Sequence, residues 1–402
     1  MRPLDDGRFQ YVSNNIIEGN DDTWWRTERL TDSEWEEVYG AHDTIESDDS
    51  LWYLPQADDC LLNESERETV NNQVLAAAEQ VREVYQDMEI EEGASYASNV
   101  KDFSRAQCKE VAALLGKAGF VSVTEDTNME NYQDIEAFYT AYKKGHDAQI
   151  TIYNVNRDGL IGAITFIYKK DVLQAYYVGI GWQEGGVPII KNTLVNDVLE
   201  IYLTEKGYFI YTYEEQIVHA DARQYWRVKP LSEKCRELTR KYIAGISFTN
   251  YNAFVTNWNS SNVEEILMPC MFEDIYRIDT GQNIQVENDR IPAELYERIM
   301  MTYFPVSKEQ LRSKCGYDAD SDGYPYEMIF ATPYAPFGEV VDYTENEDGT
   351  ITLFVDGVWI DYNSDCAFTS EIVVKPFPDG TFLYLSNKIQ PKELALPTAA
   401  FR

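Results

Sequence analysis

The sequence predicts an α+β protein of two domains, in each of which helices are followed by an antiparallel β-meander. Apolar residues recur every three to four positions between residues 65 and 142, and alternate with polar residues from residue 149 onward. The same order returns in the second half, where helical patterns precede alternating strands between Glu339 and Ile389. Helices grouped before strands, rather than interleaved with them, favour α+β over a parallel α/β fold.

The helices of the first domain are marked by their N-terminal caps. A capping box at 65–68 predicts a helix that runs to Met88. A second box at 104–107 predicts a helix that ends before Gly119. Aromatic residues at helical spacing predict a third helix over 132–142.

Strands follow in the first domain, and then the pattern stops. We expect strands at 121–123, 149–153, 160–168, 172–182, 194–203 and 208–213. The alternation ends in the segment 225–230, where Pro230 opens a new helical pattern. We therefore place the first domain at 61–227 and the second at 228–402.

The second domain repeats the order of helices and then strands. Helical patterns cover 233–244, 263–276 and 293–303, and a capping box at 307–310 begins a fourth helix. Strands of the C-terminal meander are predicted at 350–355, 358–362, 370–374 and 381–385. Asp356 and Gly357 predict a two-residue hairpin turn between the first two. By analogy of element order, this domain resembles NTF2-like folds, in which a curved sheet encloses a cone-shaped pocket.

Residues 1–60 are predicted to form an acidic, tryptophan-rich N-terminal arm. They carry four of the eight tryptophans, Trp24, Trp25, Trp35 and Trp52, within a run of acidic residues. High charge density is typical of irregular segments, but indole rings are costly to leave in water. We expect an irregular arm that docks onto the body through these rings.

The composition limits the partners of the chain. Its formal net charge is −35, whereas nucleic acids and anionic membranes bind clusters of Lys and Arg, so we expect no nucleic-acid partner. No apolar run approaches the ~18 residues of a membrane span. The N-terminus lacks the features of a signal peptide, so we expect either an exported protein whose leader has been removed or a cytoplasmic protein.

The acidic stretch 318–323 is the sharpest local motif. Asp318, Asp320 and Asp322 alternate and are followed by Gly323, as in the first half of a calcium-binding loop. The closing carboxylate of such a loop is missing, because its twelfth position is Ile329. The hypothesis is a partial calcium site, and the alternative is an acidic turn before the meander.

Catalytic motifs are weak. The chain has three histidines, no phosphate-binding glycine loop, and six cysteines that form no C-x-x-C pair, which we interpret mainly as buried thiols. The 69 acidic residues guarantee many close carboxylate pairs, so a carboxylate-dependent hydrolase such as a glycosidase stays open as an alternative.

Aromatic residues on the predicted strands offer the other route to function. Tyr176, Tyr177 and Trp182 lie on one strand, and 208–213 carries three more tyrosines. Such rings can stack on sugar faces, although core packing explains the same residues. Because strand residues alternate between faces, Tyr176 and Tyr177 must point in opposite directions.

Short patterns between residues 291 and 326 carry a family resemblance. They are Ile291-Pro-Ala-Glu-Leu-Tyr-Glu297, Tyr303-Phe-Pro305, Gln310-Leu-Arg312, Tyr317-Asp318 and Tyr324-Pro-Tyr326. This segment resembles uncharacterised exported or lipid-anchored proteins of Gram-positive anaerobic bacteria. The resemblance implies a cell-surface or secreted setting and carries no activity and no catalytic residues. The chain departs from that pattern because no lipid-acceptor cysteine lies near its start.

Together these observations favour a non-enzymatic cell-surface or secreted binding protein, whose ligand we expect to be a glycan or another extracellular molecule. One alternative is the carboxylate-dependent hydrolase. Another is a structural spacer or assembly module without a small ligand.

Overall fold

The computed structural model describes residues 2–3, 9–10, 60–91, 98–215, 220–248, 251, 253–286, 289–327 and 335–391. The chain divides into two compact units, Met1–Pro55 and Gln56–Arg402. In the first unit, strands β1 (Arg2–Pro3) and β2 (Phe9–Gln10) pair antiparallel. The rest of the predicted arm lies outside the described residues, apart from Cys60. All elements below belong to the second unit.

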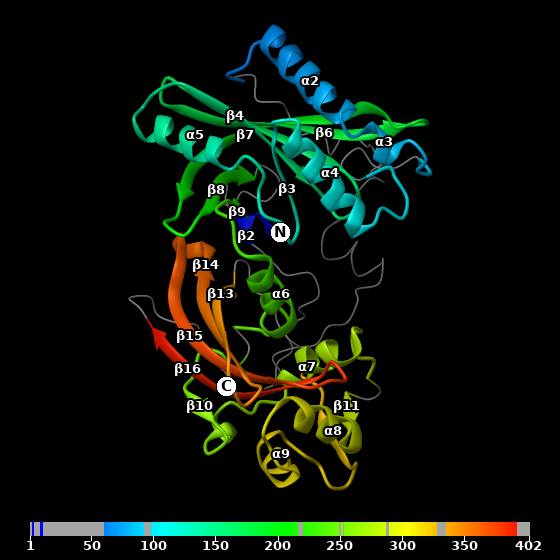
Figure 1. Cartoon of the computed structure of the whole chain (residues 1–402), viewed down its shortest axis with the longest axis vertical. Helices are drawn as coiled ribbons and strands as arrows, with labels where there is room; N and C mark the ends of the chain where they lie inside the picture. Colours follow the sequence, from blue (N-terminus) through cyan, green and yellow to red (C-terminus); the bar gives the residue numbers. More distant parts are fainter. Residues whose placement is uncertain are drawn as a thin grey trace. The chain divides into compact units, whose positions relative to one another are not determined.

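A seven-stranded sheet forms the first half of this unit (Figure 1). Its strands are β3 (Val121–Thr124), β4 (Ala148–Val155), β5 (Ile161–Lys169), β6 (Val172–Gln183), β7 (Val187–Leu203), β8 (Tyr208–Glu215) and β9 (Ala220–Arg227). They lie side by side in chain order. β3 is parallel to β4, and every other neighbouring pair is antiparallel.

Helices cover the outer face of this sheet and part of its inner face. The helices are α2 (Glu64–Glu79), α3 (Arg82–Tyr85), α4 (Arg105–Lys117) and α5 (Gln133–Lys143). Apolar residues of α2, α3 and α4 pack with one set of alternate strand residues, and α5 packs with the other set. The predicted single helix to Met88 is two helices, because Val81 leaves helical geometry with φ −114°. Its capping box uses Asn63 and Glu66 in place of 65–68.

The seven-stranded sheet curls. Register shifts leave an extra residue on β7 twice, at Lys191 opposite Gly179 and Ile180 of β6, and at Leu199 between Val198 and Glu200, and such bulges bend a strand. As a result the far strand β9 returns toward β4, although four strands separate them in the sheet order. The inner face is therefore concave.

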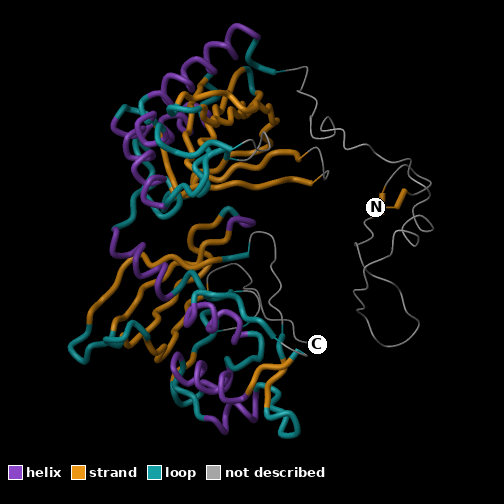
Figure 2. Tube along the Cα trace, turned by 90° about the vertical axis from the view of Figure 1, so that its right-hand side faces the viewer, coloured by secondary structure: helices purple, strands orange, loops and turns teal. Residues whose placement is uncertain are grey.

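A five-stranded antiparallel sheet forms the second half, in the order β10-β16-β15-β14-β13. Its strands are β10 (Trp258–Asn259), β13 (Phe337–Glu345), β14 (Ile351–Trp359), β15 (Ser364–Pro376) and β16 (Phe382–Pro391). Strands β11 (Arg290–Pro292) and β12 (Gly323–Pro325) form a separate pair. The helices are α6 (Glu233–Tyr242), η2 (Val263–Glu265), α7 (Met271–Thr280), α8 (Ala293–Tyr303), α9 (Lys308–Lys314) and η3 (Ile360–Tyr362). Figure 2 shows the sheet strands as a curved layer.

The predicted hairpin turn at Asp356 and Gly357 is wrong. Both residues lie inside the continuous strand β14, where Gly357 pairs with Gly338 on β13 and with Phe368 on β15. A Cβ atom on Gly357 would lie 2.3 Å from the Phe368 ring, so glycine is required here by a close approach and not by a turn. The turn before β14 lies at 346–350 instead.

The predicted α+β class with mostly antiparallel sheets is confirmed. The division of the body at residue 227 and the NTF2-like character of the second half stay predictions. Among the described residues, none of the helices combines the length and apolar character that a membrane crossing requires.

Candidate functional site

The concave face of the seven-stranded sheet holds a cavity of about 910 Å³, which we call the inner cavity. Residues from all seven strands and from the loops beside them line it, together with Phe337 at the start of β13. The lining residues are Val123, Thr124, Glu125, Asp126, Thr127, Asn154, Val155, Asn156, Arg157, Ile164, Ala175, Tyr177, Asn192, Leu194, Asn196, Tyr208, Tyr211, Tyr213, Gln224, Tyr225, Trp226, Arg227 and Phe337. Aromatic rings and side-chain amides dominate the set.

A side-chain bond inside this cavity links the edge strand β9 to β4, the second strand from the opposite edge of the curled sheet. Trp226 on β9 donates its indole N–H to Oδ1 of Asn154 on β4 at 3.2 Å. Asn154 in turn donates from Nδ2 to Oδ1 of Asn156 at 2.6 Å. The amide orientation and the indole are thereby fixed by each other, so this wall of the cavity is ordered before any ligand arrives.

Three parallel rings, Tyr213, Tyr211 and Trp226, form what we call the aromatic ladder. The Tyr213 and Tyr211 centroids lie 5.8 Å apart at 26°, and the Tyr211 and Trp226 centroids lie 5.5 Å apart at 23°. Phe166 packs against the ladder edge to face. Burial raises the pKa of Tyr211, so its phenol stays neutral at physiological pH and offers a hydroxyl that both donates and accepts.

Glycines make room for another ring on the cavity floor. A Cβ atom on Gly162 of β5 would lie 2.8 Å from Cε2 of Tyr177 on the neighbouring strand β6. The absence of that atom lets the Tyr177 ring lie close to the sheet. Burial raises the pKa of Tyr177 as well, so this phenol is also neutral.

The charged side chains at one rim are already paired. Arg157 donates from Nε and Nη2 to both carboxylate oxygens of Glu125. These bonds from Arg157 lower the pKa of Glu125 despite its partial burial. Glu125 therefore has the lowered pKa of an ion-paired carboxylate, in contrast to the raised pKa of a general acid.

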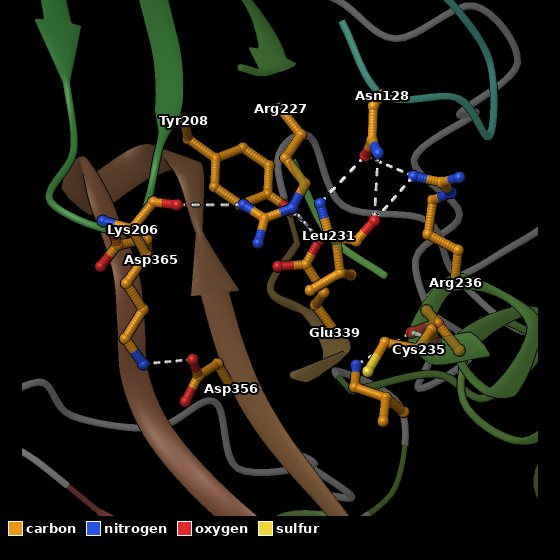
Figure 3. A network of polar contacts seen from close by, with 12 residues as sticks. Asn128, Lys206, Tyr208, Arg227, Leu231, Cys235, Arg236, Glu339, Asp356 and Asp365 are labelled. Atoms are coloured by element: carbon orange, nitrogen blue, oxygen red, sulfur yellow. Dashed lines mark hydrogen bonds and ion pairs between the residues drawn. The ribbon is translucent and has the colours of Figure 1, made fainter. Parts of the chain in front are cut away.

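At the other rim, the inner cavity meets a polar network between the two sheets (Figure 3). Tyr208 donates to Oε1 of Glu339 on β13 at 3.0 Å, and Nε of Arg227 lies 2.9 Å from the same oxygen. The Arg227 guanidinium also lies 5.4 Å from the Tyr208 ring centroid. Beside them, Lys206 forms an ion pair with the buried carboxylate of Asp356.

Burial dominates the electrostatics of this network. It raises the pKa of Glu339, and the opposing effects of Arg227 and of the Tyr208 hydroxyl are smaller. It also raises the pKa of Tyr208, with a further increase from Glu339. The network therefore holds a carboxylate that is costly to ionise at a position shared by the two sheets.

The three predicted ligand-binding aromatics lie in two different places. Tyr176 is buried on the outer face and donates to Oδ1 of Asn71 on α2 at 3.0 Å. Trp182 is 1% exposed, and its ring stacks on Tyr85 of α3 with centroids 3.7 Å apart. Tyr177 alone of the three lines the inner cavity. Their role as ligand-binding residues stays a prediction.

The carboxylates of the acidic stretch 318–323 engage protein donors. Asp318 accepts from the Asp320 amide at 3.1 Å and from the Ser321 hydroxyl at 2.7 Å. Asp322 accepts from the Tyr317 hydroxyl at 2.8 Å. Within the described part of the chain, no three His, Cys, Asp or Glu side chains are grouped as metal ligands. Calcium binding at Asp318, Asp320 and Asp322 stays a prediction.

The far side of the cavity was not predicted from the sequence. β9 was not predicted, because Ala220–Arg227 contains few apolar residues and so Trp226 and Tyr225 were not assigned to a sheet. Phe337 precedes the expected meander. The adjacent rings at 225–226 were the available signal, since aromatic residues favour strands.

Comparison with known proteins gives one match. Residues 67–401 fit the model of a family of unknown function, DUF6070. No curated protein and no solved structure is significantly similar to the chain.

Proposed function

Since the chain belongs to DUF6070, a family of unknown function, we propose from the inner cavity that it is a non-enzymatic binding protein for a carbohydrate. The single observation that carries the proposal is the aromatic ladder within a wall of side-chain amides. Tyr211 is stacked on both sides, so the end ring Tyr213 is the one that would provide an apolar face for the C–H face of a sugar, and the amides donate to and accept from its hydroxyl groups.

The size of the inner cavity supports a small ligand. About 910 Å³ lies within the range of roughly 300–1,000 Å³ that ligand sites occupy. Four of the amides come from three strands, namely Asn154 on β4, Asn192 and Asn196 on β7, and Gln224 on β9. Polar groups that converge from several strands fix the orientation of a ligand as well as its position.

The charge that lines the inner cavity at the Glu125 rim favours binding over hydrolysis, whereas Glu339, whose pKa is raised, is engaged by Tyr208 and Arg227 and does not line the cavity. A glycosidase needs one carboxyl group with a raised pKa as the acid. Glu125 instead has a lowered pKa and is held by Arg157. Its environment is that of a structural ion pair.

A carbohydrate ligand would also accord with the cell-surface or secreted setting expected from the sequence. That setting remains part of the proposal.

Truncating the ladder tests the proposal. Glycan-array screening of the purified chain, followed by calorimetry on the best ligand, should give saturable binding. The Tyr213→Ala variant should weaken that binding about tenfold, the effect of losing roughly 1.4 kcal/mol of ring stacking.

The matched control is Tyr202→Ala, which removes an exposed tyrosine of β7 that does not line the inner cavity. Its affinity should equal that of the unmodified chain. Failure of every glycan to bind, or equal losses in both variants, would refute carbohydrate binding in the inner cavity.

A further inference from the structure

A second cavity of about 320 Å³, which we call the arginine cavity, adjoins the inner cavity. The two have four lining residues in common, Thr124, Glu125, Asp126 and Arg157. The end of β3, its following turn and the paired side chains of Glu125 and Arg157 therefore separate the two spaces. A ligand that lies in the inner cavity and reaches past this wall enters the arginine cavity.

The arginine cavity concentrates positive charge. Four cationic side chains line it, Arg105, Lys109, Arg157 and Arg240, against the two carboxylates of the shared wall. These six lining side chains sum to +2, and to +1 when the nearby Glu233 carboxylate beside Arg240 is included, in a chain whose formal net charge is −35. At physiological salt the Debye length is about 8 Å, so an anion inside the cavity interacts mainly with these neighbours and less with the distant acidic surface.

Two of the arginines are only loosely engaged with protein carboxylates. Arg105 and Arg240 each approach Oδ2 of Asp126 to 4.0 Å, and Arg240 lies 3.6 Å from Glu233. These distances exceed those of direct hydrogen bonds, so the carboxylates do not saturate the guanidinium donors. A carboxylate or phosphate between the arginines would accept closer, charge-assisted bonds.

The two loosely engaged arginines come from elements that hold them apart. Arg105 is the first residue of α4, whose N-terminal end carries positive potential and is capped by Ser104. Arg240 lies on α6, which follows the last strand of the seven-stranded sheet, so the two arginines are far apart in the chain. Asn128 donates to the Leu231 carbonyl and accepts from the Leu231 amide, and these bonds hold the start of α6 beside the loop that carries Asp126. Two helices therefore place guanidinium donors around the same cavity, in positions that the fold sets without a ligand.

We propose that the arginine cavity binds the anionic group of the carbohydrate held in the inner cavity. The ligand class is then an acidic glycan, which bears a carboxylate or a phosphate ester beside a sugar ring that packs in the inner cavity. This inference rests on the proposed carbohydrate binding and adds the charge of the ligand.

Matched pairs of ligands that differ only in charge test it. Calorimetry would compare tetragalacturonic acid with its methyl ester, and mannose 6-phosphate with mannose. Within at least one pair the anionic member should bind about tenfold more tightly, and this advantage should shrink as salt is raised. The pair that responds distinguishes a carboxylate from a phosphate.

Two variants locate the effect. Arg105→Ala and Arg240→Ala should each remove most of the advantage of the anionic ligand and leave the affinity for its neutral partner unchanged. The control is Lys117→Ala, which removes a cation from the last turn of the same helix α4. Circular dichroism of each variant would establish that it is folded.

The outcomes separate the two proposals. Equal affinities for the neutral and anionic members would overturn the anion site and leave carbohydrate binding intact. Binding of neither member of either pair would reject both for these ligand classes. An anionic preference that survives in both arginine variants would place the charge recognition outside the arginine cavity and would also overturn it.

Discussion

Gly357 is a residue whose identity is set by its cross-strand partner, Phe368 on β15. The ring atoms of Phe368 would lie 2.3 to 2.5 Å from an added Cβ, and Phe368 is fully buried and cannot move aside. We therefore expect Gly357→Ala to destabilise the chain by about 1–3 kcal/mol through overpacking. Urea unfolding followed by circular dichroism measures the loss.

A second substitution checks the cause. In Gly357→Ala/Phe368→Leu the smaller side chain leaves room for the new methyl group, so the double variant should lose less stability than the sum of the two single variants. Additive losses would mean that glycine is needed at 357 for its backbone conformation and not for the space that the Phe368 ring occupies.

The same residue shows where local patterns mislead. Asp-Gly is a strong turn signal, yet in this chain it lies within β14 because Gly357 accommodates Phe368 from the next strand. Alternation was more informative at Tyr176 and Tyr177, which lie on opposite faces as strand geometry requires. The face of the sheet that holds the cavity depends on where the helices pack, and short sequence patterns do not predict that packing.

At the scale of elements, caps predicted helix starts well. The boxes at 104–107 and 307–310 begin α4 and α9 as expected, because a cap satisfies amides of its own first turn. Strand β9 and the parallel pairing of β3 with β4 were missed. Both depend on long-range partners, since β9 has little apolar alternation of its own.

Glu297 joins three elements. From α8 it accepts bonds from Arg312 on α9 at 2.6 Å and from Tyr324 on β12 at 3.1 Å, and Lys308 lies 2.8 Å away. Burial opposes its ionisation, but these partners outweigh burial and lower the pKa of Glu297. Glu297→Gln should cost about 1–2 kcal/mol at neutral pH, since one strong acceptor becomes a weaker one.

The pH dependence of the stability difference tests whether the ionised form of Glu297 is the stabilising one. A carboxyl group with a lowered folded pKa stabilises the fold above its unfolded pKa, and this contribution is lost as pH falls through the folded pKa. The difference in the free energy of unfolding between Glu297→Gln and the unmodified chain, measured in urea, should therefore shrink as the solution is acidified. The control is Glu294→Gln, an exposed position in the first turn of the same helix, which should show the smaller difference that a helix-dipole interaction gives. A difference for Glu297→Gln that persists in acid would refute the role of ionisation.

At the scale of the whole molecule, Glu339 gives the opposite pH dependence. Its pKa is raised by burial at the contact of the two sheets, so between the unfolded and folded pKa values the folded chain holds more protons. Stability contributed by this group is greatest below the unfolded pKa and falls as pH rises through the folded pKa. The free energy of unfolding of Glu339→Gln, relative to the unmodified chain, should therefore increase with pH across that window.

The comparison needs a carboxylate from the same strand. Glu345→Gln, at the exposed end of β13, should give a difference from the unmodified chain that does not vary with pH. A flat difference for Glu339→Gln as well would mean that the proton uptake belongs to another group.

Three residues, Tyr208, Arg227 and Phe337, line the inner cavity and also hold the two sheets together. Ligand binding in the inner cavity and the contact between the two sheets are then thermodynamically linked. A ligand that needs these side chains in place stabilises the contact by the free energy with which it prefers the joined form. By the same linkage, a substitution far from the cavity that separates β13 from the first sheet would weaken ligand binding by at most that factor. The second half of the chain would therefore tune a site that it touches with one ring.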